Sequence, residues 1–274
     1  KLSEFYEELK RLEIEVIRPD INKCYADFRS IDNKFYYALG GIKAVGYEAI
    51  SNVVKERTKN GKFKSINDFL NRVNPKDMNK LQLEGLVKAG AFDNLNKNRQ
   101  SLFDSIPNFI LKTKSIFDNK STNQIDLFSE DETSQDDIIN NIEDWQFEER
   151  LSKEFEAVGF FISDHPLNQF TEIFDDYKII NYFNFNSNEE IKDGNIAATL
   201  LKVQERKTTK GTSYAVLKLT DLTSVFELFI FSDILELNRE ILKEGNSLIL
   251  TLLKSISNDE NRFKRVNVQK IASL

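Results

Sequence analysis

The spacing of apolar residues changes along the chain near Gly194. Before it, apolar side chains recur at intervals of three and four, as at Leu2, Phe5 and Leu9, which predicts amphipathic helices. From Gly194 onward, short runs rich in β-branched and aromatic residues are separated by turn residues, which predicts strands. The pattern therefore predicts a multidomain α + β protein whose helical part comes first.

Five runs after Gly194 have the length and composition of strands. They span residues 196–203, 214–219, 225–231, 248–253 and 263–271. A helical stretch, 233–242, lies between the third run and the fourth. This order is typical of an OB-fold, a small Greek-key barrel that commonly binds oligonucleotides. We therefore predict a five-stranded OB-fold β-barrel over residues 194–274.

Charge is distributed unevenly, so the net charge of −6 does not describe the individual segments of the chain. Residues 121–149 contain no Lys or Arg but ten Asp and Glu, which predicts an acidic linker without a core of its own. Residues 40–100 contain twelve Lys and Arg against six Asp and Glu. Because charge is read segment by segment, a nucleic-acid partner for this basic helical part is not excluded.

Several other classes of function are disfavoured. Cys24 is the single cysteine, so no internal disulfide forms, and no apolar run approaches the ~20 residues that span a bilayer. Without a secretory signal pattern, a cytoplasmic location is expected. His165, the single histidine, is expected to order the turn before Pro166, and Asp221 is read as a turn residue. We expect no catalytic residue, metal or cofactor in this segment.

The first chemical signal is the stretch 40–46, Gly-Gly-Ile-Lys-Ala-Val-Gly, which precedes a helical pattern. A glycine turn that opens a helix brings free amides and the positive end of the helix dipole close to a phosphate. Lys43 adds a positive charge beside that turn. The phosphate contacts predicted here come from Gly41, Lys43, Val45 and Gly46. The alternative is an ordinary turn between core helices.

A second, weaker copy of the signal is Leu86-Val87-Lys88-Ala89-Gly90. It lacks the double glycine of the first copy. Two hairpins in series suit two phosphates along a duplex, so Lys88 and Gly90 are added to the predicted contacts. Such contacts carry no sequence preference, because amides and lysines do not read base edges. The prediction is a tandem helix-hairpin-helix domain that binds duplex DNA.

An apolar island interrupts the acidic linker at Gln124-Ile125-Asp126-Leu127-Phe128. A segment without a core exposes Leu127 and Phe128 unless a partner buries them. The pentapeptide resembles the sliding-clamp-binding motif of bacteria, in which a Gln fills a polar subsite and a Leu-Phe pair enters an apolar pocket. The alternative is a cluster that folds back onto a neighbouring domain.

Basic residues also gather between the first two predicted strands. Arg206, Lys207 and Lys210 lie in a loop that OB-folds use for oligonucleotides, and Tyr214 follows them. We predict that these four residues bind single-stranded DNA. The strand aromatics Tyr214, Phe226 and Phe229 either stack on bases or lie in the core, and a role in protein contacts is the alternative for this domain.

Three stretches together resemble the C-terminal part of the α subunit of bacterial DNA polymerase III. They are 37–46 (YALGGIKAVG), 86–93 (LVKAGAFD) and 158–167 (VGFFISDHPL), in the order found in that family of replicative polymerases. The resemblance implies five segments. They are the end of the fingers domain (1–39), the tandem helix-hairpin-helix domain (40–111), the linker with the clamp motif (112–144), a helical connector (145–193) and the OB-fold (194–274).

The resemblance also implies a function, namely support of processive DNA-templated DNA synthesis. The expected partners are duplex DNA, single-stranded template DNA, the sliding clamp and other replicase subunits. Nucleotidyl transfer, with its Mg²⁺, would belong to a palm domain outside this segment. Lys1 stands within a helical pattern, so a longer parent chain is expected. The alternative is a stand-alone, non-enzymatic adaptor that is recruited by the clamp and binds DNA.

Overall fold

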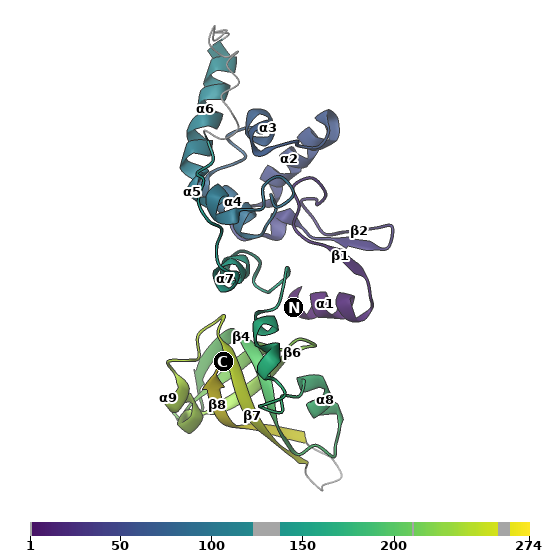
Figure 1. Cartoon of the computed structure of the whole chain (residues 1–274), viewed down its shortest axis with the longest axis vertical. Coiled ribbons are helices and arrows are strands. Elements are labelled where there is room, and N and C mark those ends of the chain that lie inside the picture. Colours follow the sequence, from purple (N-terminus) through teal and green to yellow (C-terminus); the bar gives the residue numbers. More distant parts are fainter. Residues whose placement is uncertain (1, 123–137, 210, 257–263) are drawn as a thin grey trace. The chain divides into compact units, whose positions relative to one another are not determined.

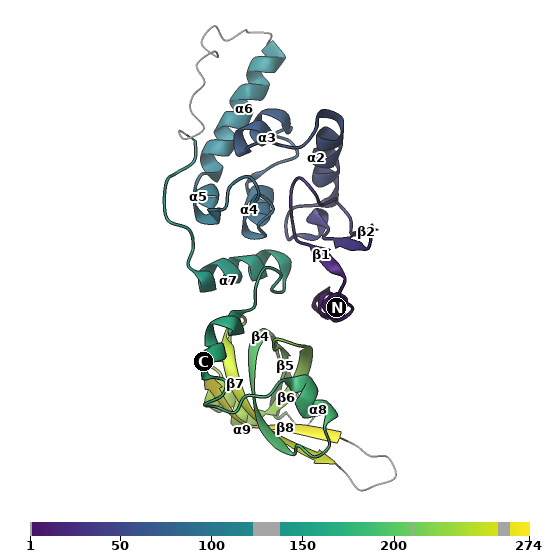
Figure 2. The ribbon, with the colours of Figure 1, turned by 45° about the vertical axis from the view of Figure 1, so that its right-hand side comes forward.

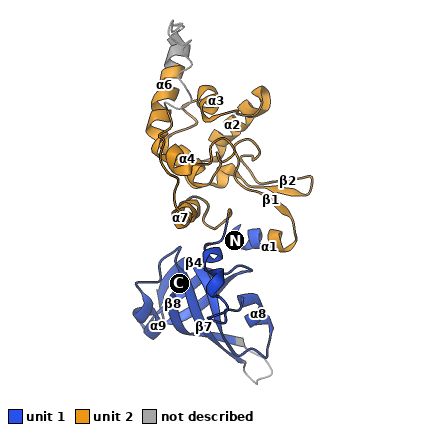
Figure 3. Ribbon diagram, in the orientation of Figure 1, with its two compact units in different colours: residues 1–8, 164–274 blue, residues 9–163 orange. Residues whose placement is uncertain are grey.

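The computed structural model describes residues 2–122, 138–209, 211–256 and 264–274. These form two compact units, shown in different colours in Figure 3. One comprises residues 9–163, here called the helical unit. The other comprises residues 1–8 and 164–274, here called the sheet unit. In the part of the chain that the structure describes, no helix is long and apolar enough to cross a membrane.

The helical unit consists of short helices and a small sheet (Figure 1). After α1 (Leu2–Arg11), which continues from the other unit, come β1 (Glu15–Ile17), β2 (Arg29–Ile31), β3 (Lys34–Tyr36) and the 3-10 turn η1 (Leu39–Gly41). The helices are α2 (Tyr47–Asn60), α3 (Ile66–Arg72), α4 (Lys80–Lys88), α5 (Arg99–Asp104), α6 (Ile106–Thr122) and α7 (Phe147–Val158). The three strands pair in the order β1-β3-β2.

Polar side chains define where three of these helices begin. The Ser65 side chain accepts the Asp68 amide at α3, and Asn98 accepts the Ser101 amide at α5. At α4, Asn79 and Gln82 form a reciprocal capping box. Each cap satisfies a backbone donor that has no partner within its own helix. The helices α2 and α7 have no side-chain cap, and the residue before α2 is Gly46, which has no side chain to offer.

The buried core of the helical unit includes aromatic residues and apolar residues of both predicted hairpins. Phe69 packs edge-on against Phe63 and Phe92, with ring centroids 5.1 and 5.0 Å apart. The apolar residues of the two hairpins, among them Ile42, Val45, Leu86 and Val87, are buried in the same unit. Burial of these side chains holds the two turns in place.

The sheet unit contains five antiparallel strands that curve around a common interior (Figure 2). They are β4 (Asp193–Lys207), β5 (Ser213–Thr220), β6 (Val225–Phe231), β7 (Ser247–Ile256) and β8 (Lys264–Ser273). The helix α9 (Ser232–Asn238) lies between β6 and β7, as the sequence predicts. The 3-10 helix η3 (Pro166–Ile173) and α8 (Tyr182–Ser187) precede the sheet.

The strand order is β6-β5-β4-β7-β8, so β6 and β8 are the edges. The edge strands approach each other, but no ladder joins them among the described residues. The sheet is therefore open, and the predicted closed OB-fold barrel is not confirmed. Ladder closure depends on long-range geometry that the alternation of side chains does not encode.

Side chains alternate strictly along β6. Phe226, Leu228 and Ile230 are buried, whereas the residues between them face outward. Phe226 stacks on Tyr182 at a centroid distance of 3.8 Å, which assigns it to the core. Asp221 is a turn residue, as predicted, because its Oδ1 accepts the Thr223 and Ser224 amides at 2.8 and 2.7 Å. Its Oδ2 accepts the Tyr182 amide at 2.6 Å.

Candidate nucleic-acid interface

The first predicted hairpin connects η1 to α2 through residues 42–46. Ile42 and Val45 are buried and anchor the turn, while Lys43, Ala44 and Gly46 are exposed. Ala44 has φ +63° and Gly46 has φ +82°, so the turn passes twice through the left-handed region. A Cβ added at Gly46 would meet nothing within 4 Å. The outer side of this turn is open to a ligand.

The amides of this hairpin divide into two groups. The Lys43 amide donates to the Ala157 carbonyl at 3.0 Å, and the Val45 amide donates to the Ile42 carbonyl at 3.2 Å. The amides of Ala44 and Gly46 have no acceptor among the residues described. They adjoin the N-terminus of α2, a helix of 14 residues without a side-chain cap. Unsatisfied amides at a positive helix end form a favourable position for an anion.

Helix α4 packs against this hairpin and contacts its carbonyl groups. Gln82 donates from Nε2 to the Val45 carbonyl at 2.9 Å. A Cβ at Gly85 would lie 2.7 Å from the Lys43 carbonyl oxygen and 3.0 Å from a methyl group of Val45. Only glycine therefore allows α4 to approach the turn so closely. The carbonyls of the hairpin are held inward, which leaves its free amides on the outer side.

The second predicted hairpin has a different environment. Gly90 follows α4 with φ +77°, and a Cβ there would overlap the guanidinium of Arg99. The Arg99 side chain is only 4% exposed. It donates to both carboxylate oxygens of Asp93, at 2.9 and 2.7 Å, and to the Lys88 carbonyl at 3.0 Å. A guanidinium of this chain thus occupies the space above Gly90.

A buried ionic network surrounds Arg99. The Glu154 carboxylate is fully buried, accepts from Arg99 at 3.2 Å and also accepts the amides of Ile162 and Ser163 at 2.9 and 2.8 Å. Arg150 pairs with Asp93 at 3.2 Å and also with Asp144. Burial alone would lower the pKa of Arg99, but the hydrogen bonds and charges of Asp93 and Glu154 raise it. No local sequence pattern indicates this network.

The two hairpin lysines also differ. Lys43 is exposed. The Lys88 side chain is 20% exposed, and its ammonium lies 2.9 Å from the Glu156 carboxylate and over the ring of Phe103. Among the described residues the Lys43 ammonium forms no ion pair, whereas the Lys88 ammonium is already paired with a carboxylate.

Two of the four predicted single-strand contacts, Arg206 and Tyr214, lie on the outward face of β4, β5 and β6. Arg206 on β4 stands opposite Tyr214 on β5, which stands opposite Phe231 on β6. Arg206 and Lys207 are exposed and Tyr214 is half-buried, while Lys210 lies outside the described residues. Phe231 is 59% exposed and Phe229 is 52% exposed. Phe231 was not predicted, although the alternation along β6 could have identified it.

A shallow cavity of about 180 Å³ lies next to this row on the same three strands. Its lining comprises Lys202, Gln204, Arg206, Val216, Lys218, Glu227 and Phe229. Lys218 pairs with Glu4 of α1 at 2.7 Å, which lowers the pKa of Glu4, although its slight burial acts in the opposite direction. This face thus combines basic side chains with exposed aromatic rings.

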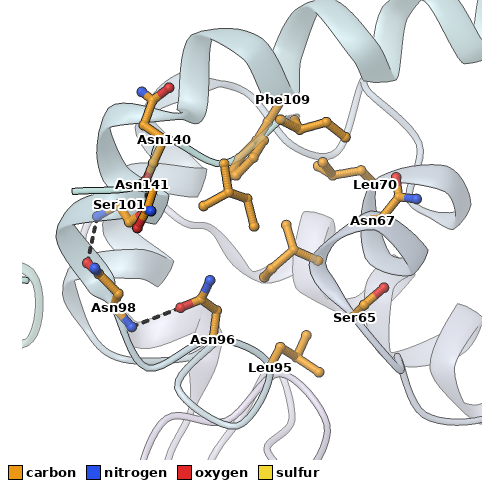
Figure 4. A pocket seen from close by; sticks show the side chains of 13 residues that line it. Ser65, Asn67, Leu70, Leu95, Asn96, Asn98, Ser101, Phe109, Asn140 and Asn141 are labelled. Atoms are coloured by element: carbon orange, nitrogen blue, oxygen red, sulfur yellow. Dashed lines mark hydrogen bonds between the residues drawn. The ribbon is translucent and has the colours of Figure 1, made fainter. Parts of the chain in front are cut away.

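A pocket in the helical unit is not suited to an anion (Figure 4). It measures about 540 Å³, and its lining contains only apolar, amide and hydroxyl side chains. In Figure 4, Asn96, Asn98 and Ser101 form a hydrogen-bonded row along one wall. Since no charged residue lines it, this pocket offers no counter-charge to a phosphate.

Two further predictions relate to ligands. The clamp motif, Gln124 to Phe128, lies outside the described residues. Within the described residues there is no group of three His, Cys, Asp or Glu side chains that could hold a metal ion.

Comparisons with known proteins add to this geometry. The model of the family described as helix-hairpin-helix motif matches residues 13–102, which include both hairpins. The DNA polymerase III subunit alpha of Borreliella burgdorferi is 29% identical over 281 residues, which cover 100% of this chain and 24% of the relative. The proteins of the same name from Rickettsia bellii and Rickettsia conorii are 34% and 36% identical.

The Rickettsia alignments cover 84% and 76% of this chain and 21% and 17% of those relatives. The chain thus spans about a quarter or less of the length of these relatives. The chain is therefore homologous, over its whole length, to a part of the DNA polymerase III α subunit, and it carries a helix-hairpin-helix motif.

Proposed function

We propose that this chain is a DNA-holding, non-catalytic part of a replicative DNA polymerase, and that it supports processive DNA-templated synthesis. The observation that carries the proposal is the first hairpin, whose exposed amides adjoin the uncapped positive end of α2. Phosphoryl transfer and its Mg²⁺ belong to a palm domain outside this segment. The homology to polymerase α subunits favours this function over a stand-alone adaptor.

Duplex DNA is held through its phosphates. Gly41 and Gly46 let the backbone approach a DNA phosphate. Val45 anchors the turn, and Lys43 supplies a positive charge. Lys88 and Gly90 belong to the same surface through the second hairpin. Phosphate contacts fix position without reading sequence, so binding is sequence-independent and falls steeply as salt rises.

The sheet unit binds single-stranded template as a partly open OB-fold. Its strand order and the inserted helix α9 support this proposal. Arg206, Lys207 and Lys210 attract the backbone, and Tyr214 with Phe231 offers rings on which bases stack. The exposed charges and rings of one face are the two features that sequence-independent single-strand binding requires.

The acidic linker recruits the sliding clamp, and through it the other replicase subunits. Gln124 sets the register, Leu127 and Phe128 are the buried anchors, and Ile125 and Asp126 contribute little. Burial of each anchor contributes about 1.5–3 kcal/mol, so replacing both by Ala lowers clamp affinity by roughly two orders of magnitude or more. A titration of both forms against the clamp of the same organism tests this, and equal affinities would contradict it.

Duplex binding is tested by fluorescence anisotropy over a salt series. Lys43→Ala is expected to weaken duplex binding and to reduce the salt slope by about one unit. Lys59→Ala is the matched control, because Lys59 is exposed on the same helix, roughly 18 Å beyond the hairpin. Equal losses in the two variants would contradict a phosphate site at the first hairpin.

A further inference from the structure

The C-terminal half of α7 holds a carboxylate, Glu156, that two lysines approach. Lys88 at the end of α4 lies 2.9 Å from Glu156, and Lys153 lies 3.9 Å from the same carboxylate. Both lysine side chains are partly buried, at 20% and 28% exposed, while Glu156 is 48% exposed. The carboxylate thus faces solvent, and the ammonium groups stand around it.

The first hairpin also contacts α7 next to Glu156. The Lys43 amide donates to the carbonyl of Ala157, the residue after Glu156. The pKa of Glu156 agrees with this geometry. Partial burial would raise it, but Lys88 lowers it through a hydrogen bond, and the charges of Lys88, Lys153 and Lys43 lower it further. The lysines of both hairpins therefore lie at the same end of α7, Lys88 through its ammonium and Lys43 through its backbone amide.

The charges in this cluster do not balance. Three ammonium groups against one carboxylate leave two positive charges in excess. Each ammonium carries three donors, whereas one carboxylate offers two oxygens, so donors exceed acceptors. A backbone phosphate supplies an anionic group of similar size and can replace the carboxylate.

We propose that Lys43, Lys88 and Lys153 form a single site for one DNA phosphate, which Glu156 occupies until DNA binds. The inference rests on the proposed duplex-binding function and goes further, because it makes the two hairpins hold one phosphate rather than two. It also assigns a contact to Lys153 of α7, which belongs to neither hairpin.

A double-mutant cycle distinguishes one shared phosphate from two separate ones. Duplex affinity and salt slope are measured for Lys43→Ala, Lys88→Ala and the double variant. Contacts to separate phosphates are independent, so their affinity losses would multiply and the slope would fall by about 1.8 in total. For a shared phosphate, the double variant loses little more affinity than the weaker-binding single variant, and its slope falls by about 0.9.

Substitution of the resident carboxylate gives a second, independent readout. Glu156→Gln keeps the shape and removes the competing charge, so duplex affinity is expected to rise about three- to tenfold. Glu148→Gln is the matched control, since Glu148 is exposed on the first turn of the same helix and changes the net charge equally. Lys153→Ala is expected to weaken binding more than Lys59→Ala does. Thermal unfolding of each variant verifies that it is folded.

The outcomes separate the two proposals. A wild-type chain that does not bind duplex at low salt overturns the proposed function and this inference with it. A wild-type chain that binds, with multiplicative lysine effects or with equal gains from Glu156→Gln and Glu148→Gln, overturns only the shared site.

Discussion

Gly46 and Gly90 stand at turns beside helices with nearly the same positive φ, +82° and +77°, but their surroundings differ. Above Gly46 there is open space, and above Gly90 lies the guanidinium of Arg99. Lys43 is exposed, while Lys88 is paired with Glu156. Similar local sequence thus serves two purposes: the first hairpin presents backbone donors outward, and the second ties α4, α5 and α7 together.

The buried network of the second hairpin gives the largest expected effect. Glu154→Ala removes one of the two carboxylates that pair with the buried Arg99 and leaves the Ile162 and Ser163 amides without their acceptor, so the free energy of unfolding is expected to fall by about 3–5 kcal/mol. Urea unfolding measures it. Glu148→Ala on the same helix is the control and should change stability by less than about 0.5 kcal/mol. Similar values for both would show that the network contributes no more than an exposed carboxylate.

The two glycines test the comparison directly. Gly90→Ala combines a positive φ with an overlap on Arg99 and is expected to cost roughly 2–5 kcal/mol of stability. Gly46→Ala also has a positive φ but meets open space, so its cost is that of the backbone conformation alone, about 1–3 kcal/mol. Its main effect is expected on duplex affinity, because a methyl group would then stand beside the free amides. If Gly46→Ala binds duplex as well as wild type, the hairpin amides do not contact phosphate.

The support beneath the first hairpin is tested by Gly85→Ala. The added methyl group meets the Lys43 carbonyl, at a cost of about 1–3 kcal/mol, while the gain in helix propensity offsets about 1 kcal/mol. A small loss of stability is therefore expected together with a loss of duplex affinity, because the turn must move. Urea unfolding measures the stability, and fluorescence anisotropy of the same sample measures the duplex affinity. A more stable variant with unchanged affinity would show that α4 does not position the turn.

Features that depend on local spacing could be predicted from the sequence. The five strands, the helix between the third and fourth, and the turn at 40–46 follow from periodicity and glycine placement. The roles of Arg99 and Lys88 could not be predicted, because their partners Glu154 and Glu156 are 55 and 68 residues away. No local pattern encodes such a pairing, so Lys88 has the same sequence context whether its charge is free or neutralised.

The smallest expected effect is the pH dependence of the Lys88–Glu156 pair. The pKa of Glu156 is lowered in the folded state, so the pair stabilises the fold above the ordinary carboxyl pKa of 4.5. That contribution is lost as the pH falls through the lowered value. The carboxylate is about half exposed, so the contribution is below about 1 kcal/mol.

Glu156→Gln removes this titration, so the stability difference between wild type and variant should be present at pH 6 and shrink in stronger acid. Urea unfolding from pH 6 to pH 3 follows it, with Glu148→Gln as the reference for a carboxylate that pairs with no lysine in the described structure. A difference that stays constant across this range would show that Lys88 and Glu156 are not paired in solution. Lys88 would then be as free as Lys43, and the two hairpins would offer equivalent charges to DNA.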